Sequence, residues 1–242
     1  MINMKVSVVT PCMNSAGTIR QTIESVLHQT YRNIEYIVVD GGSSDGTLDI
    51  IKEYLPRFHG RMRYVSEKDR GIYDAMNKGI RMTRGGLIGI VCSDDFYEPG
   101  AVEKVVSHLT KDRYQVIYGY CRVMADGHAA GFIKGSHKDL RQHMIPHPTC
   151  FVTRDVYRDF GMFLTVFQIS SDYELMLRLY NSGEVTFTQI RSVLSNFRIG
   201  GESRNLKRRT FENIVFKFYH KAYSPIETLK RLVGLYLYAE YE

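Results

Sequence analysis

The stretch IEYIVVDGGSSDGTLDIIKEYL, residues 34–55, contains the succession of strand, turn and helix patterns that decides the fold. Its apolar and β-branched residues at 34–39 predict a buried strand, and the glycines and serines that follow predict a turn. Leu48, Ile51 and Leu55 then occur at helical spacing. The stretch therefore predicts a strand, a turn and a helix in direct succession.

The same unit occurs on either side of this stretch. KVSVVT at 5–10 predicts a strand, and the apolar residues within 18–28 predict the helix after it. Strands at 63–66 and 87–92 enclose a helix over 73–82. Because strands that alternate with helices pair mostly in parallel, we expect an α/β fold with helices on both faces of the sheet.

The second half of the sequence predicts mixed α and β structure. Residues 116–124 and 129–134 flank the turn sequence ADGH, which favours an antiparallel hairpin. Pro99 stands where a helix start tolerates proline, before a run of valines. The further elements that we expect are a strand at 149–153, a helix at 172–181, a strand at 193–199 and terminal helices at 206–223 and 225–238.

Length and composition favour one large domain. The 242 residues suffice for an α/β domain with a full core and a tail, and the 44% hydrophobic and 24% charged residues are typical of a globular protein. The four cysteines are widely spaced without a CxxC pair, which favours reduced thiols in a cytoplasm. No stretch approaches the roughly 20 apolar residues that span a bilayer, and no signal peptide is evident, so we expect a cytoplasmic protein.

The net charge of +6 is concentrated near the C-terminus. Residues 204–231 contain eight Lys or Arg and two Glu, which leaves the rest of the chain near neutral. This segment could meet an anionic membrane surface or a nucleic acid, or its charges could face water on a packed helix. No nucleic-acid motif accompanies the charge, so we expect no nucleic-acid partner.

The loops that follow the predicted strands are the first candidates for a binding site. Ligands of open α/β sheets bind beyond the carboxyl ends of the strands. These loops are residues 11–15, 40–46, 69–71 and 93–95.

Asp94 and Asp95 belong to the turn Ser93-Asp94-Asp95, which follows the apolar strand LIGIVC. Two neighbouring carboxylates repel each other unless a positive charge lies near both. A Mg²⁺ or Mn²⁺ ion that also binds a diphosphate would supply that charge, because such ions prefer oxygen ligands and often use one or two carboxylates. The alternative is that these residues only cap the helix after Pro99.

Asp40 follows its strand in the same way, and the glycines beside it let a ligand approach the backbone closely. Its carboxylate could accept a hydrogen bond from the imide of uracil or from a ribose hydroxyl, or it could simply stabilise a turn.

Asp74, Asn77 and Lys78 lie on one face of a predicted helix, where they could reach a nucleotide or phosphate. The alternative for them is an exposed charged segment.

Two further residues have both a functional and a structural interpretation. His147, between Pro146 and Pro148, could bind a metal or a phosphate, although lone histidines are usually structural. Asp172 follows two serines at a predicted helix start, where an aspartate is either a cap or a catalytic group. The residues by themselves leave both choices open.

Six motifs, in this order, resemble the bacterial family 2 glycosyltransferases of surface-polysaccharide assembly. The similarity covers residues 4–200, and the six motifs together are far more specific than any one of them. They are VSVVTPCMNSAGTIRQTIESVLHQTY, IEYIVVDGGSSDGT, SEKDRGIYDAMNKGI, IVCSDDFYEPGA, HPTCFVTRDVY and SSDYELMLRLYNSG.

This resemblance implies a GT-A fold, a nucleotide-sugar donor with UDP favoured, a Mn²⁺ or Mg²⁺ ion, and inversion at the anomeric carbon. It implies a catalytic domain over 1–200, with a nucleotide-sugar half over 1–95 and an acceptor half over 96–200, and a helical extension over 201–242. The expected acceptor is a hydroxyl of a saccharide, lipid-linked at the inner face of the cell membrane, which the basic terminal helices would contact peripherally.

The resemblance also assigns residues to roles. Asp172 matches the general base of the family, and Asp95, with His147 as a second candidate, is the expected metal ligand. Asp94 would touch the ribose or the sugar, and Ser93 replaces the first acid of the family's DxD-type turn. The residues expected to contact the nucleotide sugar are Thr10, Pro11, Asn14, Asp40, Asp69, Gly71, Lys78, Ser93 and Asp94.

The composition also bears on the type of reaction. Because the chain has no tryptophan, the Gln-x-x-Arg-Trp motif of processive family members is absent, and we expect one sugar to be added per encounter. A sugar nucleotidyltransferase is the enzymatic alternative, but the loop TPCMNSAGT contains neither the Arg nor the Lys that those enzymes usually have there. The other alternative is a non-catalytic basic protein that binds nucleic acid or membrane.

Overall fold

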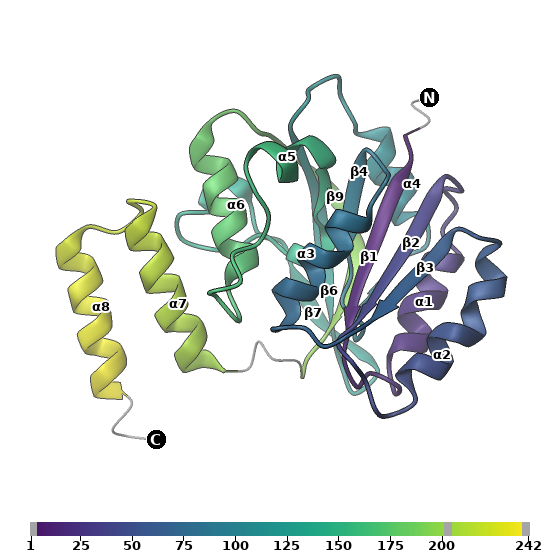
Figure 1. Cartoon of the computed structure of the whole chain (residues 1–242). Helices are drawn as coiled ribbons and strands as arrows, with labels where there is room; N and C mark the ends of the chain where they lie inside the picture. Colours follow the sequence, from purple (N-terminus) through teal and green to yellow (C-terminus); the bar gives the residue numbers. More distant parts are fainter. Residues whose placement is uncertain (1–3, 201–204, 239–242) are drawn as a thin grey trace.

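The computed structural model describes residues 4–200 and 205–238. Within these residues, one sheet of nine strands has the order β3-β2-β1-β4-β8-β6-β9-β5, with β7 paired to β6 (Figure 1). The strands are β1 Val6–Cys12, β2 Ile34–Asp40, β3 Met62–Ser66, β4 Leu87–Ile90, β5 Phe96–Tyr97, β6 Gln115–Ala125, β7 His128–Ile133, β8 Phe151–Thr153 and β9 Thr186–Arg198. The helices are α1 Ile19–Leu27, α2 Thr47–Tyr54, α3 Ile72–Met82, α4 Ala101–Ser107, α5 Arg154–Asp159, α6 Ser171–Ser182, α7 Leu206–Tyr219 and α8 Pro225–Tyr238.

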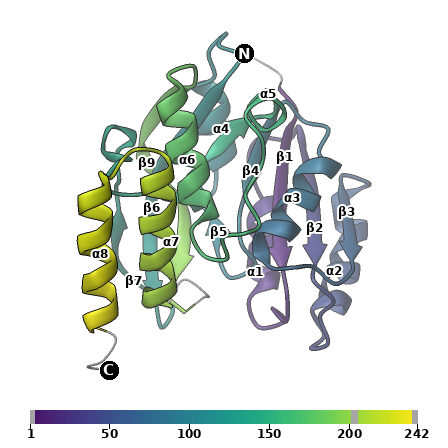
Figure 2. The ribbon, with the colours of Figure 1, turned by 60° about the vertical axis from the view of Figure 1, so that its left-hand side comes forward.

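The two faces of the sheet form two separate hydrophobic cores. Val8 of β1 and Val38 of β2 pack with α1, α2 and α4, whereas Val9 and Val39 pack with α3, α5 and α6. Successive residues of a strand point to opposite faces, so strands that are buried on both faces are apolar without alternation. Figure 2 shows α3 and α6 in front of the strands. The expected α/β fold with helices on both faces is confirmed.

The strands β3, β2, β1 and β4 pair in parallel, and the carboxyl ends of the first three align. Cys12 at the end of β1 lies opposite Asp40 at the end of β2, which lies opposite Ser66 at the end of β3. The loops after these strands consequently leave the sheet at one edge. This is the edge where the sequence predicts the binding site.

The second half of the sheet is mixed, as its sequence predicts. β8 pairs antiparallel with β4 and with β6, whereas β9 runs parallel to β6. The predicted hairpin forms between β6 and β7. Its two turn residues, Asp126 and Gly127, have φ angles of 49° and 81°, the positive values that a type I′ turn requires.

The structure differs from the predicted elements at several ends. Residues 147–149 form a 3-10 turn, so the strand predicted there begins only at Phe151. Pairing with β6 extends β9 back to Thr186, and α7 ends at Tyr219, earlier than predicted. The short elements β5 and α5 were not predicted, because they contain too few residues to show a periodic pattern.

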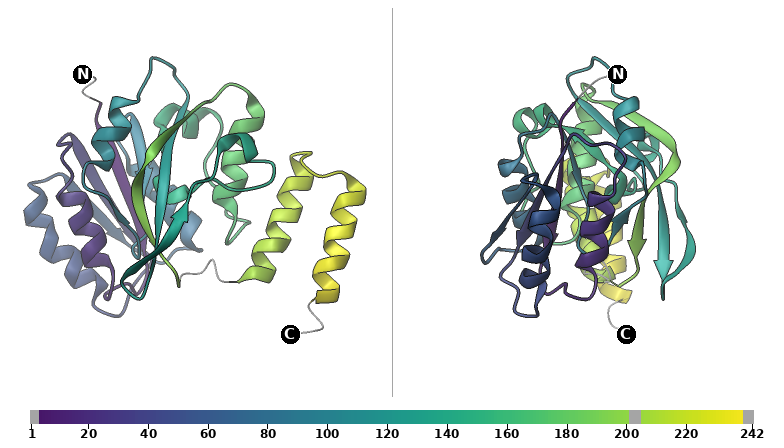
Figure 3. Two further views of the ribbon diagram at one scale, coloured as in Figure 1. Left: turned by 180° about the vertical axis from the view of Figure 1, so that it is seen from behind. Right: turned by 90° about the vertical axis from the view of Figure 1, so that its right-hand side faces the viewer.

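The helices α7 and α8 lie side by side at one end of the molecule, beyond α6 and away from α1 and α2 (Figure 1, Figure 3). Phe216 of α7 is buried against Phe167 and Tyr173, which joins α7 to α6 and to the segment before it. The predicted domain boundary adjoins residues 201–204, which lie outside the described part of the chain. Among the described helices, none has the length and apolar character needed to cross a membrane.

Candidate active site

The loops after β1, β2 and β4 meet at the carboxyl edge of the sheet. The backbone N–H of Asn14 donates to Ser43 Oγ at 2.7 Å. The hydroxyls of Ser15 and Ser93 share a hydrogen bond of 2.8 Å. Asn14 has a positive φ of 47°, which this residue type tolerates better than most. Three of the four predicted loops therefore form one continuous surface.

The loop after β3 joins the same surface. Asp69 Oδ1 accepts a hydrogen bond from the Gly71 N–H at 3.0 Å. Asp69 Oδ2 lies so near Gly41 that a Cβ added to Gly41 would come within 2.6 Å of it. A side chain at position 41 would therefore displace the Asp69 carboxylate from this position. Gly71, with a φ of 114°, precedes the first turn of α3.

Asp94 and Asp95 form an acidic turn after β4. Their carboxylate oxygens and the Cys92 Sγ lie within 4.8 Å of one another. Asp95 is only 2% exposed, and its burial, together with the charge of Asp94, raises its pKa well above the ordinary value. Thr22 of α1 fixes the turn, because its hydroxyl lies 2.9 Å from the carbonyl oxygen of Ser93 and 2.6 Å from that of Asp95.

A divalent cation fits this turn. Burial makes two adjacent carboxylates costly to ionise, and a bound cation would offset that cost. The oxygens of Asp94 and Asp95 suit Mg²⁺ or Mn²⁺. Burial, followed by the charges of Asp95, Asp94 and Asp172, raises the pKa of the Cys92 thiol well above its ordinary value, so Cys92 stays protonated and is a poor ligand for such ions.

Asp172 reaches the site from the first turn of α6. Its Oδ1 accepts hydrogen bonds from Tyr73 Oη and from the backbone N–H of Tyr173, both at 2.9 Å. The N-cap position of α6 belongs to Ser170, so Asp172 is not the capping residue. The side chain of Asp172 is half-buried. Of the two interpretations that the sequence leaves open, the position of Asp172 favours the functional one.

Two predicted nucleotide contacts lie below this surface. Thr10 is fully buried, and its hydroxyl accepts a hydrogen bond from Tyr36 Oη at 2.9 Å. Its position on β1 directs the side chain into the core, so the predicted contact of Thr10 with the nucleotide sugar would have to use its backbone. Asp40 is fully buried too, and its carboxylate accepts from the hydroxyls of Ser43 and Ser66 and from two N–H groups of its own loop. In this structure the Asp40 carboxylate stabilises the turn, and Pro11 is buried beside it at the end of β1.

The polar face predicted on α3 is largely occupied by other contacts. Asn77 is buried, and its amide donates to the carbonyl of Phe163 at 2.8 Å and accepts from the Phe163 N–H at 3.1 Å. Asn77 therefore fixes the segment before α6 and is not available to a phosphate. Lys78 Nζ pairs with Glu67 at 3.0 Å and lies 3.8 Å from Asp74. A contact between Lys78 and a donor diphosphate would replace its pairing with Glu67.

His147 is buried near Asp172. Its ring meets that of Phe163 edge-on, with 5.7 Å between the ring centroids. Burial lowers the pKa of His147, and the charge of Asp172 acts in the opposite direction. The group of metal-ligating atoms at the acidic turn does not include His147. Its assignment as a metal ligand stays a prediction.

Arg198, at the end of β9, was not among the predicted site residues. Its backbone N–H donates to Asp95 Oδ1 at 3.0 Å, and its guanidinium donates to the carbonyl of Asp94 and to the side chain of Gln21. The guanidinium also lies over the ring of Phe96, 5.1 Å from its centroid. Burial raises the pKa of both carboxyls of the turn, and the charge of Arg198 opposes that effect. No local sequence signal marks Arg198, because only the pairing of β9 with β6 and β5 brings it here.

Comparison with known proteins identifies the family. The model of Glycosyl transferase family 2 matches residues 7–158. Chondroitin synthase from Escherichia coli is 31% identical over 211 residues, which cover 84% of this chain and 30% of that protein. The PGL/p-HBAD biosynthesis glycosyltransferase of Mycobacterium bovis is 24% identical over 208 residues, which cover 85% of this chain and 81% of that protein. The chain thus spans less than a third of the first relative and most of the second.

Solved structures share the fold at lower identity. Residues 1–349 of S. aureus TarS, in complex with UDP-GlcNAc, match with a TM-score of 0.74 at 16% identity, covering 94% of this chain and 69% of that chain. The mannosyltransferase PcManGT from Pyrobaculum calidifontis, in complex with GDP-Man and Mn²⁺, matches with a TM-score of 0.70 at 18% identity, covering 98% of this chain and 71% of that chain. The architecture is the GT-A fold. The chain belongs to glycosyl transferase family 2, a family of nucleotide-sugar-dependent glycosyltransferases.

Proposed function

We propose that this chain is an inverting, non-processive glycosyltransferase that transfers a sugar from a nucleotide diphosphate to a hydroxyl group of a saccharide. The observation that carries the proposal is the presence of two acidic groups at the carboxyl edge of a GT-A sheet: the Asp94-Asp95 turn after β4, and the Asp172 carboxylate, which contacts Tyr73 in the first turn of α3. The acidic turn suits the leaving diphosphate, and the separate carboxylate suits the acceptor. An inverting displacement needs one group that stabilises the leaving diphosphate and one base that takes the proton of the acceptor hydroxyl.

The donor would lie over the loops that Asn14, Ser43 and Asp69 join. The glycines of these loops let a ligand approach the chain closely. UDP is favoured as the nucleotide, and complexes of TarS with UDP and UDP-GlcNAc and of GalNAc-T7 with UDP support this choice. The complex of PcManGT with GDP-Man makes GDP the second candidate.

Asp94 and Asp95 would hold a Mn²⁺ or Mg²⁺ ion, which would supply positive charge to the departing diphosphate. The Mn²⁺ in the complexes of PcManGT and GalNAc-T7 supports the assignment. Asp95 is oriented by the Arg198 N–H, and the burial of its carboxylate limits competing water. The guanidinium of Arg198 adds a fixed positive charge beside the turn.

Asp172 would act as the general base. Within the described residues, both hydrogen bonds to its carboxylate use Oδ1, so Oδ2 can take the proton of an acceptor hydroxyl. Tyr73 Oη lies 2.9 Å from Oδ1 and can donate to it, which helps to hold the carboxylate in one orientation. The role follows from the position of Asp172 in the first turn of α6, where it contacts Tyr73 of α3.

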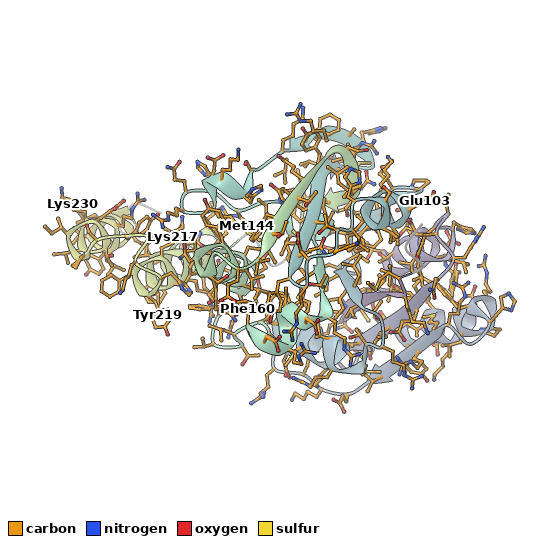
Figure 4. The ribbon with its side chains drawn as sticks, turned by 90° about the horizontal axis from the view of Figure 1, so that it is seen from above. Glu103, Met144, Phe160, Lys217, Tyr219 and Lys230 are labelled. Carbon is orange, nitrogen blue, oxygen red and sulfur yellow. The ribbon has the colours of Figure 1, made fainter. Side chains whose placement is uncertain are left out.

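The acceptor is proposed to be a lipid-linked saccharide of a cell-surface polysaccharide, met at the inner face of the cell membrane. The outer surfaces of α7 and α8 combine exposed apolar and basic side chains, a combination that favours anionic lipid. In Figure 4, Tyr219 and Lys230 lie on these helices at the outer end of the molecule. The exposed apolar and aromatic residues are Leu206, Phe211, Val215, Phe218, Tyr219, Ile226, Leu229, Val233, Tyr236 and Leu237. Arg204, part of the basic segment in the sequence, lies outside the described residues.

The test measures release of nucleoside diphosphate from UDP-GlcNAc, UDP-glucose and GDP-mannose with Mn²⁺, with and without alkyl glycosides as acceptors. We expect acceptor-dependent release with at least one donor, and a product of inverted anomeric configuration by NMR. A variant that combines Asp94→Asn and Asp95→Asn serves as the control without a metal site. Synthesis of a nucleotide sugar from a nucleoside triphosphate and a sugar phosphate would instead identify a nucleotidyltransferase. Retention of configuration would overturn the proposed mechanism.

A further inference from the structure

A carboxylate of α7 binds the segment that leads into α6. Glu212 is only 4% exposed. Its Oε1 accepts a hydrogen bond from the backbone N–H of Gln168, and its Oε2 accepts from those of Ile169 and Ser170, each at 2.9 Å. Arg208, one turn earlier on α7, pairs with Oε1 at 3.0 Å. One side chain thus satisfies three consecutive backbone donors.

These three donors have no secondary structure to satisfy them. Residues 161–170 connect α5 to α6 as irregular backbone. A buried N–H without an acceptor is costly, and irregular segments must therefore find acceptors in side chains or water. An ionised carboxylate has enough lone pairs for three N–H groups and an arginine, and such charge-assisted bonds are strong. Glu212 therefore determines where residues 168–170 lie.

The same segment is connected to the proposed base. Tyr73 Oη lies 2.6 Å from the carbonyl oxygen of Ile169 and 2.9 Å from Oδ1 of Asp172. A phenol has a single proton to donate, so the position of Ile169 decides how that proton is shared between the two acceptors. Glu212 binds the N–H of Ile169, and Tyr73 binds its carbonyl. A continuous set of hydrogen bonds thus runs from Glu212 to Asp172.

Further contacts seat α7 against this part of the molecule. His220, just after α7, lies 2.8 Å from Oε1 of Glu174, which is two residues beyond Asp172 on α6. Lys217, labelled in Figure 4, donates from its Nζ to the carbonyl of Gln142 at 3.0 Å, in the loop that leads to His147. These contacts hold α7, the helix that carries Glu212, against α6 and against the loop that leads to His147.

We propose that Glu212 is a positioning residue for the reaction. It fixes residues 168–170 and, through Ile169 and Tyr73, the orientation of the Asp172 carboxylate. The inference rests on the proposed function, because it assigns Glu212 a role through the proposed base. It also makes α7, which lies outside the family match at residues 7–158, a part of the catalytic unit.

The experiment compares Glu212→Ala and Glu212→Gln with wild type, and uses Glu227→Gln as the matched control. Glu227 is a half-buried glutamate of α8 whose carboxylate pairs only with Arg231 among the interactions of the described residues. Amide hydrogen exchange is measured at residues 168–170 and at Tyr173, whose N–H reports the position of the Asp172 carboxylate. Turnover and donor KM are measured on the same samples.

We expect exchange at these amides to become faster in Glu212→Ala and, to a smaller extent, in Glu212→Gln, whose amide oxygen retains part of the acceptor capacity. Turnover should fall about tenfold or more in Glu212→Ala while donor KM stays within about twofold, because misplacement of a reacting group affects the chemical step more than donor binding. Glu227→Gln should resemble wild type. If Glu212→Ala does not fold, the same exchange and turnover measurements on Glu212→Gln are compared with wild type.

Unchanged exchange at residues 168–170 and Tyr173 would show that Glu212 does not fix the segment. Faster exchange with normal turnover would reduce Glu212 to a structural residue, and a rise in donor KM equal to the loss in turnover would place its effect at the donor site. Each of these outcomes overturns the proposal. The exchange measurement needs no substrate, so it tests the contacts of Glu212 even if no donor supports transfer. The absence of transfer with every donor would overturn the proposed function instead.

Discussion

The backbone N–H of Arg198 donates a hydrogen bond to Oδ1 of Asp95 at 3.0 Å, although 103 residues separate the two along the chain. The bond orients a carboxylate that is almost completely buried after β4. The acidic turn therefore depends on both halves of the chain, because β4 presents the carboxylates and β9 orients one of them. This relationship distinguishes Asp95 from its neighbour Asp94, which has no such backbone donor from β9 in the described structure.

Asp95→Ala should be more damaging than Asp94→Ala. Asp95 is the more deeply buried of the two and the one that Arg198 orients, so its loss should remove the metal site more completely. Wild-type transfer should stop in EDTA and return with Mn²⁺ or Mg²⁺. The measurement is turnover as a function of added Mn²⁺ for the three proteins. Full wild-type activity in excess chelator would contradict the metal assignment.

Asp172→Asn should lower transfer by about 100-fold or more, because the amide cannot accept the proton of the acceptor. Donor affinity, measured by calorimetry with a nucleoside diphosphate and Mn²⁺, should hardly change. Asp49→Asn, an exposed acid in the first turn of α2, is the control. Near-normal turnover would make His147 the next candidate for the base, and a collapse of donor affinity would assign Asp172 to the nucleotide site.

The protein should bind anionic vesicles at low salt more strongly than neutral ones. Lys221, between α7 and α8, and Lys230 of α8 are exposed, so the variant that combines Lys221→Glu and Lys230→Glu should lose most of the difference. Sedimentation with phosphatidylcholine vesicles, with and without phosphatidylglycerol, measures the effect. Equal sedimentation with both vesicle types would favour the other interpretation of the charge, a packed helix whose basic residues face water.

The attachment of α7 to α6 should weaken in acid. Burial tends to raise the pKa of Glu174, but hydrogen bonds from His220 and Arg178 outweigh burial and lower it. A carboxyl whose pKa is lowered by folding contributes stability that is complete above its unfolded-chain pKa of about 4.3 and is lost as the pH falls through the lower folded value.

Glu174→Gln should therefore lower the free energy of unfolding by roughly 3 kcal/mol near pH 7, because it leaves the partners of a buried ion pair uncompensated. The difference from wild type should shrink below about pH 4, where the wild-type carboxyl begins to take up its proton. Urea denaturation at both pH values measures the difference. A constant difference across this range would contradict the assigned ion pair.

Local patterns made the first half of the fold predictable. The strand at 34–39, the turn after it and the helix with Leu48 and Ile51 all form as expected, because apolar runs and glycine-rich turns specify structure over a few residues. The acidic turn was predictable for a related reason, since loops after parallel strands must share one edge of the sheet. The burial of the Thr10 side chain was not predictable, because the direction of a side chain near a strand end depends on how that strand packs.

The sequence by itself determined the α/β class, and it predicted the edge of the candidate site and the acidic residues Asp94, Asp95 and Asp172, because periodicity, turn chemistry and motif order are local properties of the chain. Only the tertiary structure decided which of these residues meet, and which others support them. The contacts of Arg198 with Asp95, and of Glu212 with Ile169, join segments far apart in sequence. Such contacts depend on the order of the strands and the docking of α7, and no spacing along the chain encodes either.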